Sequence, residues 1–370
     1  MTPTLTSTLT AASKQWASRP ADERFTSLVD MLEHFRGLRR NSAAKVVPTG
    51  VLSVAPTAET ADAGLVLRGS AGTAFAPTHW SFGQLAGLAG APAGYLRTLP
   101  APIAADALNY GLRRRPVEEV GLLLTRDGAV RAATGPKYGR IWNADIVDGL
   151  VRNFGDGVND SSWRVPGEFG KAVDVTKANT TLFAGDRDMF VFLADETNRI
   201  EIPNRRDGKT GSLARGFFVW NSEVGSTTFG ISTFLFDYVC CNRIVWGATD
   251  VKTLKLRHSS GAPDRFLREI APALQTYANS SAGSVVAAIE SARSKRIGQT
   301  GEEVATFLAT RFGRKLGESM QTAHLLEEGR PIETLWDAAT AATAVARGIE
   351  YQDERVALER LGGSMLDLAA

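Results

Sequence analysis

The chain has 370 residues, of which 44% are hydrophobic and 22% charged, so it can fill a sizeable core and is not a disordered chain. Its formal net charge of only +2 excludes a polycation, so nucleic-acid binding requires basic residues gathered on one face. The start of the chain lacks the features of a signal peptide, and no run approaches the length of a membrane span. The only cysteines, Cys240 and Cys241, are adjacent and rarely pair with each other, so a reduced, cytoplasmic location is expected.

The N-terminal half is predicted to alternate helices and strands. Residues 1–13 are rich in threonine and serine and are expected to form a flexible N-terminus. A helix is predicted from Pro20, because proline suits a first turn and apolar residues recur at helical spacing until Gly37. Asp127-Gly128 between two apolar runs predicts a β-hairpin. The other elements expected here are two or three strands in residues 46–76, a short helix capped by Ser81, and helices over residues 102–112 and 143–154.

Residues 216–246 are the stretch around which the rest is expected to be organised. Phe217 to Trp220 predicts a buried strand, and the residues up to Gly225 form a polar turn. A buried helix is predicted next, because one helical stripe contains Ile231, Phe234, Leu235, Tyr238 and Val239. Polar groups at the ends of so apolar a helix need hydrogen-bond partners. They are therefore structural staples or a site: Asn221, Ser222, Glu223, Cys241 and Asn242.

The rest of the chain predicts strands followed by helices. Strands are expected over residues 189–193, 199–202 and 251–258, and helices from Pro263 to Ile297, with breaks, and from Glu302 to Leu361. From residue 301 the composition becomes acidic and rich in alanine, which leaves the preceding part correspondingly basic. We therefore expect an α+β fold with a mixed, mainly antiparallel sheet and packed helices. Its expected parts are the N-terminus (1–13), an α+β body (14–300) and a helical C-terminal segment (301–370).

Two basic segments are the candidates for a nucleic-acid interface. On a strand over residues 251–258, alternation places Lys255 and Arg257 on one face, where they suit phosphates. Proteins that bind single strands combine a basic groove with aromatic rings on which bases stack. The alternative is that these residues form solvated turns and core aromatics. The expected contacts are Arg113, Arg114, Arg115, Arg131, Lys137, Tyr138, Arg140, Lys255, Arg257 and His258.

The turn Lys137-Tyr138-Gly139-Arg140 has the cations and free amides to hold a phosphate, although an ordinary turn is the alternative. It lacks the glycine spacing of a Walker loop, so neither ATP hydrolysis nor a cofactor is expected.

Catalysis has weaker support in the sequence. Ser222 lacks the Gly-x-Ser-x-Gly elbow of hydrolases, and Glu223 ahead of the predicted helix suits a capping carboxylate. Cys240, Cys241 and His258 lack the spacing of zinc ligands, so no metal is expected there.

Three carboxylates, Asp186, Asp188 and Asp195, are an alternative magnesium site. Gly185 and Arg187 between them favour a hairpin turn instead.

Several short motifs together resemble one family. They are NSEVG from Asn221 with the Cys-Asn pair downstream, WASRPADERFTSL from Trp16, YLRTLP from Tyr95 with LNY from Leu108, Arg131-Ala132 before KYGR from Lys137, Arg257-His258, and LWD from Leu335. This ordered set, which spans about residues 12–361, resembles the phage- and plasmid-borne family catalogued as domain of unknown function 932. The resemblance implies a protein of mobile genetic elements, and a similarity of that family to single-strand-annealing proteins has been suggested.

We therefore expect a mobile-element accessory protein that binds nucleic acid, namely single-stranded DNA, with a role in annealing or recombination and as a homo-oligomer. One alternative is an enzyme of unknown reaction with a site around Asn221, Glu223 and His258, although the sequence leans against an enzyme. A second alternative is a protein-binding factor that acts against host defence. A hydrogen bond between Glu223 and His258 in a deep pocket favours the enzyme.

Overall fold

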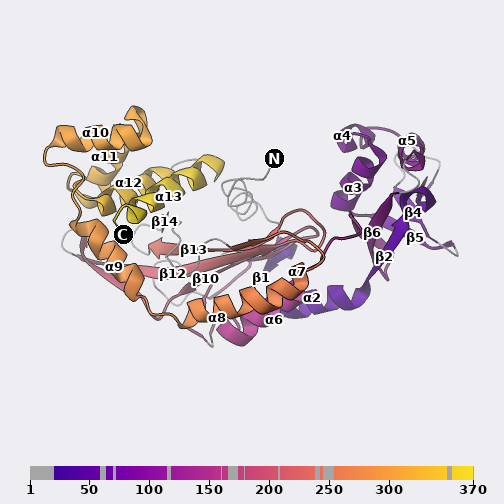
Figure 1. Cartoon of the computed structure of the whole chain (residues 1–370), viewed down its shortest axis with the longest axis horizontal. Coiled ribbons are helices and arrows are strands. Elements are labelled where there is room, and N and C mark those ends of the chain that lie inside the picture. The colour runs from indigo at the N-terminus through magenta and orange to yellow at the C-terminus, as the bar shows by residue number, and fades with distance from the viewer. Residues whose placement is uncertain are drawn as a thin grey trace.

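The computed structural model describes residues 21–58, 64–69, 72–114, 118–159, 161–165, 174–178, 180–206, 209–237, 242–244, 254–347 and 352–369. The fold is α+β, as predicted, but the strands form two separate sheets in a main lobe and a small lobe (Figure 1). The helices of the C-terminal part lie at the end of the main lobe that is remote from the small lobe (Figure 1). The expected N-terminus 1–13, Arg115 and Cys241 lie outside the described residues.

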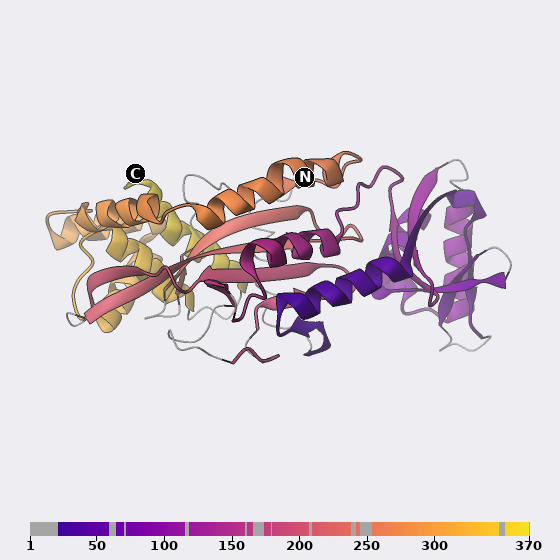
Figure 2. The ribbon, with the colours of Figure 1, turned by 90° about the horizontal axis from the view of Figure 1, so that it is seen from below.

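The main lobe is built on an antiparallel sheet of nine described strands, with the central order β1-β9-β10-β12-β13-β14. Strands β8, β11 and β15 pair with β10, β12 and β13, respectively. Helices α2 (Leu28–Asn41), α6 (Asn143–Phe154) and α8 (Ala271–Asn279) cover one face of the sheet (Figure 2). The strands are β1 (Arg24–Phe25), β8 (Trp163–Arg164), β9 (Leu182–Ala184), β10 (Met189–Asp195), β11 (Ile200–Arg206), β12 (Lys209–Asn221), β13 (Phe229–Asp237), β14 (Asn242–Ile244) and β15 (Leu254–Leu256).

The helix predicted after Gly225 is wrong for its described part, because this segment is strand β13, paired with β12; Tyr238 and Val239 lie outside the described residues. Phe229 and Ile231 pack into the core cluster under the helices, whereas Phe234 packs with aromatic residues on the opposite face. A strand buried on both faces need not alternate apolar and polar residues, so its spacing can imitate a helical stripe. Its aromatic and β-branched residues favour the strand.

The small lobe consists of described residues between Ser42 and Thr134. Its sheet has the order β2-β6-β7-β5-β4-β3, in which only β5 and β7 run parallel among the described ladders. The predicted hairpin is confirmed as β6–β7, with Gly128 at φ +87°. Thr78, rather than the predicted Ser81, caps α3, because its hydroxyl accepts from the Ser81 amide. The elements are β2 (Ser42–Pro48), a 3-10 turn (Thr49–Val51), β3 (Ser53–Pro56), β4 (Leu65–Arg68), β5 (Ala74–Pro77), α3 (His79–Ala89), α4 (Ala93–Leu96), α5 (Ala101–Arg113), β6 (Glu119–Thr125) and β7 (Ala129–Thr134).

Helices α2 and α6 carry the chain into and out of the small lobe and pack side by side. Arg36 pairs with Asp148 (2.9 Å), and Arg39 pairs with Asp145 (2.6 Å), so the two helices are antiparallel. α2 begins later than predicted, because the Ser27 hydroxyl accepts from the Asp30 amide and caps it there. The predicted helix over residues 143–154 is confirmed as α6.

The C-terminal helices cover the far end of the main sheet. Trp336 and Leu308 share one core cluster with Ile200 of β11 and Ile244 of β14. The segment from residue 301 therefore packs on the sheet as part of the main lobe. Its elements, with those that precede it, are α7 (Ala262–Arg265), a π-helical turn (Phe266–Ile270), α9 (Gly283–Ser294), α10 (Gly301–Phe312), α11 (Arg314–Glu328), α12 (Leu335–Arg347) and α13 (Gln352–Asp367).

Candidate nucleic-acid interface at the lobe junction

Four segments that are distant in the sequence meet where the two lobes join. We call this place the lobe junction, and it comprises residues 135–140, 185–188, 221–226 and 257–259. The Gly139 amide donates to the His258 carbonyl (3.3 Å), so the first and last segments lie side by side. The Tyr138 hydroxyl donates to Ser222 O (2.7 Å), and Ser222 Oγ donates to Arg187 O (2.6 Å). These hydrogen bonds tie all four segments together.

Glu223 is the buried centre of the junction. Its Oε2 lies 2.8 Å from Nη2 of Arg131 on β7, and its Oε1 accepts from the Asn143 amide (2.8 Å). Arg131 Nη1 also donates to Ser42 Oγ (3.2 Å). Glu223 was expected to cap a helix over residues 231–239, but it caps α6 instead, where a carboxylate favours the positive helix end. One side chain therefore links the small lobe to the first turn of α6.

The polar residues beside Glu223 also hold the backbone in place. Asn221 Nδ2 donates to the Ile141 carbonyl (2.9 Å) and to Asn143 Oδ1 (2.7 Å), and all three residues lie in the interior. Ser222 Oγ accepts from the Val224 amide (3.2 Å). Asn221 and Ser222 thus act as structural staples of the segment, which is one of the two roles that the sequence left open.

Helix α3 of the small lobe contacts the same segment. Trp80 Nε1 (3.1 Å) and Gln84 Nε2 (2.7 Å) both donate to the Val224 carbonyl. Gln84 Oε1 in turn accepts from the Ala133 amide on β7 (2.9 Å). Gly225 follows at φ +87°, a backbone conformation that favours glycine. Neither Trp80 nor Gln84 was expected at a site, since no motif in the sequence marks a contact between lobes.

His258 and Tyr138 form the contact between the first and last segments. Their rings stack at a centroid distance of 4.7 Å, and His258 Nδ1 lies 3.0 Å from Gly139 O. A Cβ at Gly139 would lie 1.7 Å from Ser259 O, so the close approach requires glycine. Burial lowers the pKa of His258 to about 4, and the positive charge of Arg140 acts in the same direction against the hydrogen bond to Gly139.

The low pKa of His258 predicts acid sensitivity of the junction. Unfolded histidine has a pKa of 6.5, so below that pH the unfolded chain binds a proton more readily than the folded one. The contribution of neutral His258 to the free energy of unfolding is therefore complete above pH 6.5, and it is lost as the pH falls to about 4. We expect His258 alone to lower the free energy of unfolding by up to roughly 3 kcal/mol in this window.

Urea denaturation at a series of pH values measures this loss. His258→Gln should flatten the dependence. His34→Gln should flatten it in the same direction, because burial also lowers the pKa of His34, so the two variants together show how much of the acid sensitivity belongs to each histidine. An unchanged slope in His258→Gln contradicts the prediction.

Arg140 is held between two aromatic rings. Its guanidinium carbon lies 5.4 Å from the Tyr138 ring centroid and 5.7 Å from that of Trp142. Burial lowers the pKa of Arg140 and raises that of Tyr138. Together with the Arg131–Glu223 pair, these contacts direct Arg131, Tyr138, Arg140 and His258 toward protein partners rather than toward solvent.

The exposed cations of the junction are Lys137, Arg257 and Arg187. Lys137 lies two residues before Gly139 and Arg257 directly before His258, so the backbone hydrogen bond brings together two of the basic segments expected from the sequence. Arg187 was considered only as part of a turn, and that turn is confirmed between β9 and β10 by the Gly185 N–H···O Asp188 bond (2.9 Å). No pattern in the sequence signalled its proximity.

The remaining expected contacts lie elsewhere. Arg113 and Arg114 are exposed at the end of α5, where Arg114 lies 5.7 Å from the exposed Tyr110 ring. Lys255 is half-buried on β15, and its pKa is lowered by burial and by the charge of Arg360. Asn242 begins β14.

The enzyme alternative predicts a hydrogen bond between Glu223 and His258. Glu223 and His258, both in the described part of the chain, make no hydrogen bond to each other. Among the same described residues, no three His, Cys, Asp or Glu side chains gather as a metal site requires. Asp195 pairs with the buried Arg215 (3.4 Å).

No helix in the described ranges is both long and apolar enough to span a membrane. Comparisons with protein-family models, curated proteins and solved structures give no match to this chain. The resemblance to the phage- and plasmid-borne family therefore stays a prediction.

Proposed function

We propose that the protein binds single-stranded DNA across the lobe junction. The observation that supports this proposal is that Lys137 and Arg257, two exposed cations from distant segments, lie within two residues of one backbone hydrogen bond, that between Gly139 and His258. Arg187 in the adjoining turn adds a third exposed cation, although its Nε lies 3.4 Å from Asp188 Oδ2 and Asp186 beside it is also exposed. Such a cluster attracts phosphates even when the net charge of the whole chain is small.

The buried contacts of the junction make this surface preorganised. The ion pair of Glu223 with Arg131 and the stack of Tyr138 with His258 fix the backbones that carry Lys137 and Arg257. Cations that are already positioned lose less conformational entropy when they bind a ligand. We therefore assign the buried residues a positioning role and the exposed cations the contacts.

The proposed role is that of a mobile-element accessory protein that promotes annealing or recombination as a homo-oligomer. A cytoplasmic location is part of the proposal, because Cys240 and Cys241 suit a reducing compartment. No bond chemistry is required, since electrostatic attraction and stacking supply the binding energy.

Fluorescence anisotropy with a labelled single-stranded oligonucleotide tests the proposal. Three phosphate contacts predict that Kd rises about 20-fold between about 50 and 200 mM salt, because fewer counterions are released favourably at high salt. The variant Lys137→Ala/Arg257→Ala should bind more weakly and lose about two thirds of this salt dependence.

The matched control is Arg311→Ala/Lys315→Ala, which removes one exposed arginine and one exposed lysine from α10 and α11. It should bind like the unchanged protein. Absence of binding at low salt, or an equal loss in both double variants, ends the proposal.

A further inference from the structure

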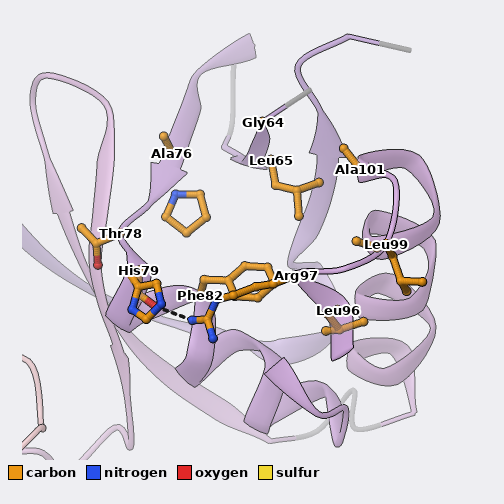
Figure 3. Close-up of a pocket in the computed structure, with 12 residues that line it drawn as sticks. Gly64, Leu65, Ala76, Thr78, His79, Phe82, Leu96, Arg97, Leu99 and Ala101 are labelled. Atoms are coloured by element: carbon orange, nitrogen blue, oxygen red, sulfur yellow. Dashed lines mark hydrogen bonds between the residues drawn. The ribbon is translucent and has the colours of Figure 1, made fainter. Parts of the chain in front are cut away.

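The small lobe contains a cavity that the lobe junction does not use (Figure 3). It has a volume of about 520 Å³ and lies between β4, β5, α3 and the start of α5. Its walls are mostly apolar, and none of the lining residues that the structure describes is acidic. Cavities of 300–1,000 Å³ with apolar walls and a few polar groups are typical of small-ligand sites. The apolar side chains that line it include those of Leu65, Pro77, Phe82, Leu96 and Leu99.

Arg97 and His79 supply the polar side of the cavity (Figure 3). Arg97 Nη2 donates to the His79 carbonyl (2.9 Å), and its guanidinium carbon lies 5.0 Å from the Phe82 ring centroid. These contacts fix the guanidinium beside the cavity. Within the described residues, the Nε and Nη1 donors of Arg97 and the imidazole of His79 have no hydrogen-bond partner. Both side chains are exposed, so these donors are open to solvent and to a ligand that enters the cavity. Donors at the edge of an apolar space suit an anionic group attached to an apolar or aromatic body.

The cavity and the lobe junction lie on the same helix. His79 and Phe82 of α3 line the cavity, whereas Trp80 and Gln84 of the same helix hold the junction segment at Val224. A DNA single strand that crosses the lobe junction therefore passes the cavity with only helix α3 between them. Proteins that handle single strands commonly turn a base out of the strand into a pocket with apolar or aromatic walls.

We propose that this cavity binds one nucleotide of a single strand, with the base between the apolar walls and the phosphate on Arg97 and His79. This inference rests on the proposed function, since it names a subsite of the same bound strand. A guanidinium stacked on Phe82 presents its other face to the base, and its free donors face the phosphate.

Titration calorimetry with thymidine monophosphate as the probe tests the cavity without an oligonucleotide. We expect the monophosphate to bind at least 10-fold more tightly than thymidine or inorganic phosphate. Thymidine lacks the phosphate, and inorganic phosphate lacks the base. Arg97→Ala should weaken its binding at least 10-fold, and Arg97→Lys, which retains the charge, should restore part of it.

The control is Arg311→Ala, which removes an exposed arginine from α10 of the main lobe and should leave the binding of thymidine monophosphate unchanged. The melting temperature of each variant shows whether it is folded. Inorganic phosphate binding as tightly as the monophosphate, or full binding by a folded Arg97→Ala variant, overturns the inference.

The oligonucleotide assay separates the two proposals. If the oligonucleotide binds through Lys137 and Arg257 but thymidine monophosphate does not bind, the cavity inference fails and the proposed function stands. If the monophosphate binds in an Arg97-dependent manner and no oligonucleotide binds, the proposed function fails and the cavity stands as a site for free nucleotides.

Discussion

Glu223→Ala should lower the free energy of unfolding by about 3–5 kcal/mol. The substitution leaves the Arg131 guanidinium buried without its carboxylate and removes the acceptor of the Asn143 amide at the start of α6. An uncompensated buried charge is among the most destabilising changes in a protein. Urea denaturation followed by tryptophan fluorescence measures the loss.

A double variant separates the stability lost with the ion pair from the stability lost with side-chain packing. Arg131→Met/Glu223→Leu removes both charges and should be more stable than Glu223→Ala, because neither group is then left unpaired. Glu223→Gln keeps the size of the side chain and should be intermediate. A loss of less than about 1 kcal/mol in Glu223→Ala would show that the pair does not hold the lobes together.

Trp220→Ala should have an effect of similar size, about 3–5 kcal/mol, because it empties a large buried site. Trp220 is fully buried on β12, directly before the junction segment, and its ring lies 5.2 Å from that of Phe218. Its register partner on β13 is Gly230, over which the indole lies. A Cβ at Gly230 would come within 2.0 Å of Trp220 Cζ2.

This contact also provides the control. Gly230→Ala introduces the clash and should destabilise the unchanged protein, whereas the same substitution in a Trp220→Ala background should cost much less. Thermal and urea denaturation of the four proteins give the coupling between the two positions. Additive effects would contradict the packing of the indole against the glycine.

Local patterns predicted much of the fold. Asp127-Gly128 predicted the β6–β7 hairpin, because the left-handed conformation that Gly128 adopts is one that glycine favours. The helical spacing of Ile146, Val147 and Leu150 predicted α6, since that helix buries only one face. β13 was predicted as a helix because it is buried on both faces, and its apolar residues then carry no clear period.

The contacts of the lobe junction were harder to predict from the sequence, because they depend on how the two lobes pack. The residues Asn221 to Glu223 were recognised as either staples or a site, but their partners Arg131, Tyr138 and Asn143 lie about 80 to 90 positions away. A basic side chain looks the same in sequence whether it meets a phosphate or a buried carboxylate. Arg131 and Lys137 could not be distinguished until their burial was known.

The pairing of α2 with α6 has a consequence for the history of the protein. Because Arg39 at the end of α2 pairs with Asp145 at the start of α6, the chain leaves for the small lobe and returns from it at one place. A short link there would close the main sheet without cutting any of its strands. The small lobe thus has the topology of an insertion, a cassette that can be gained, exchanged or lost while its host domain keeps folding around the same core.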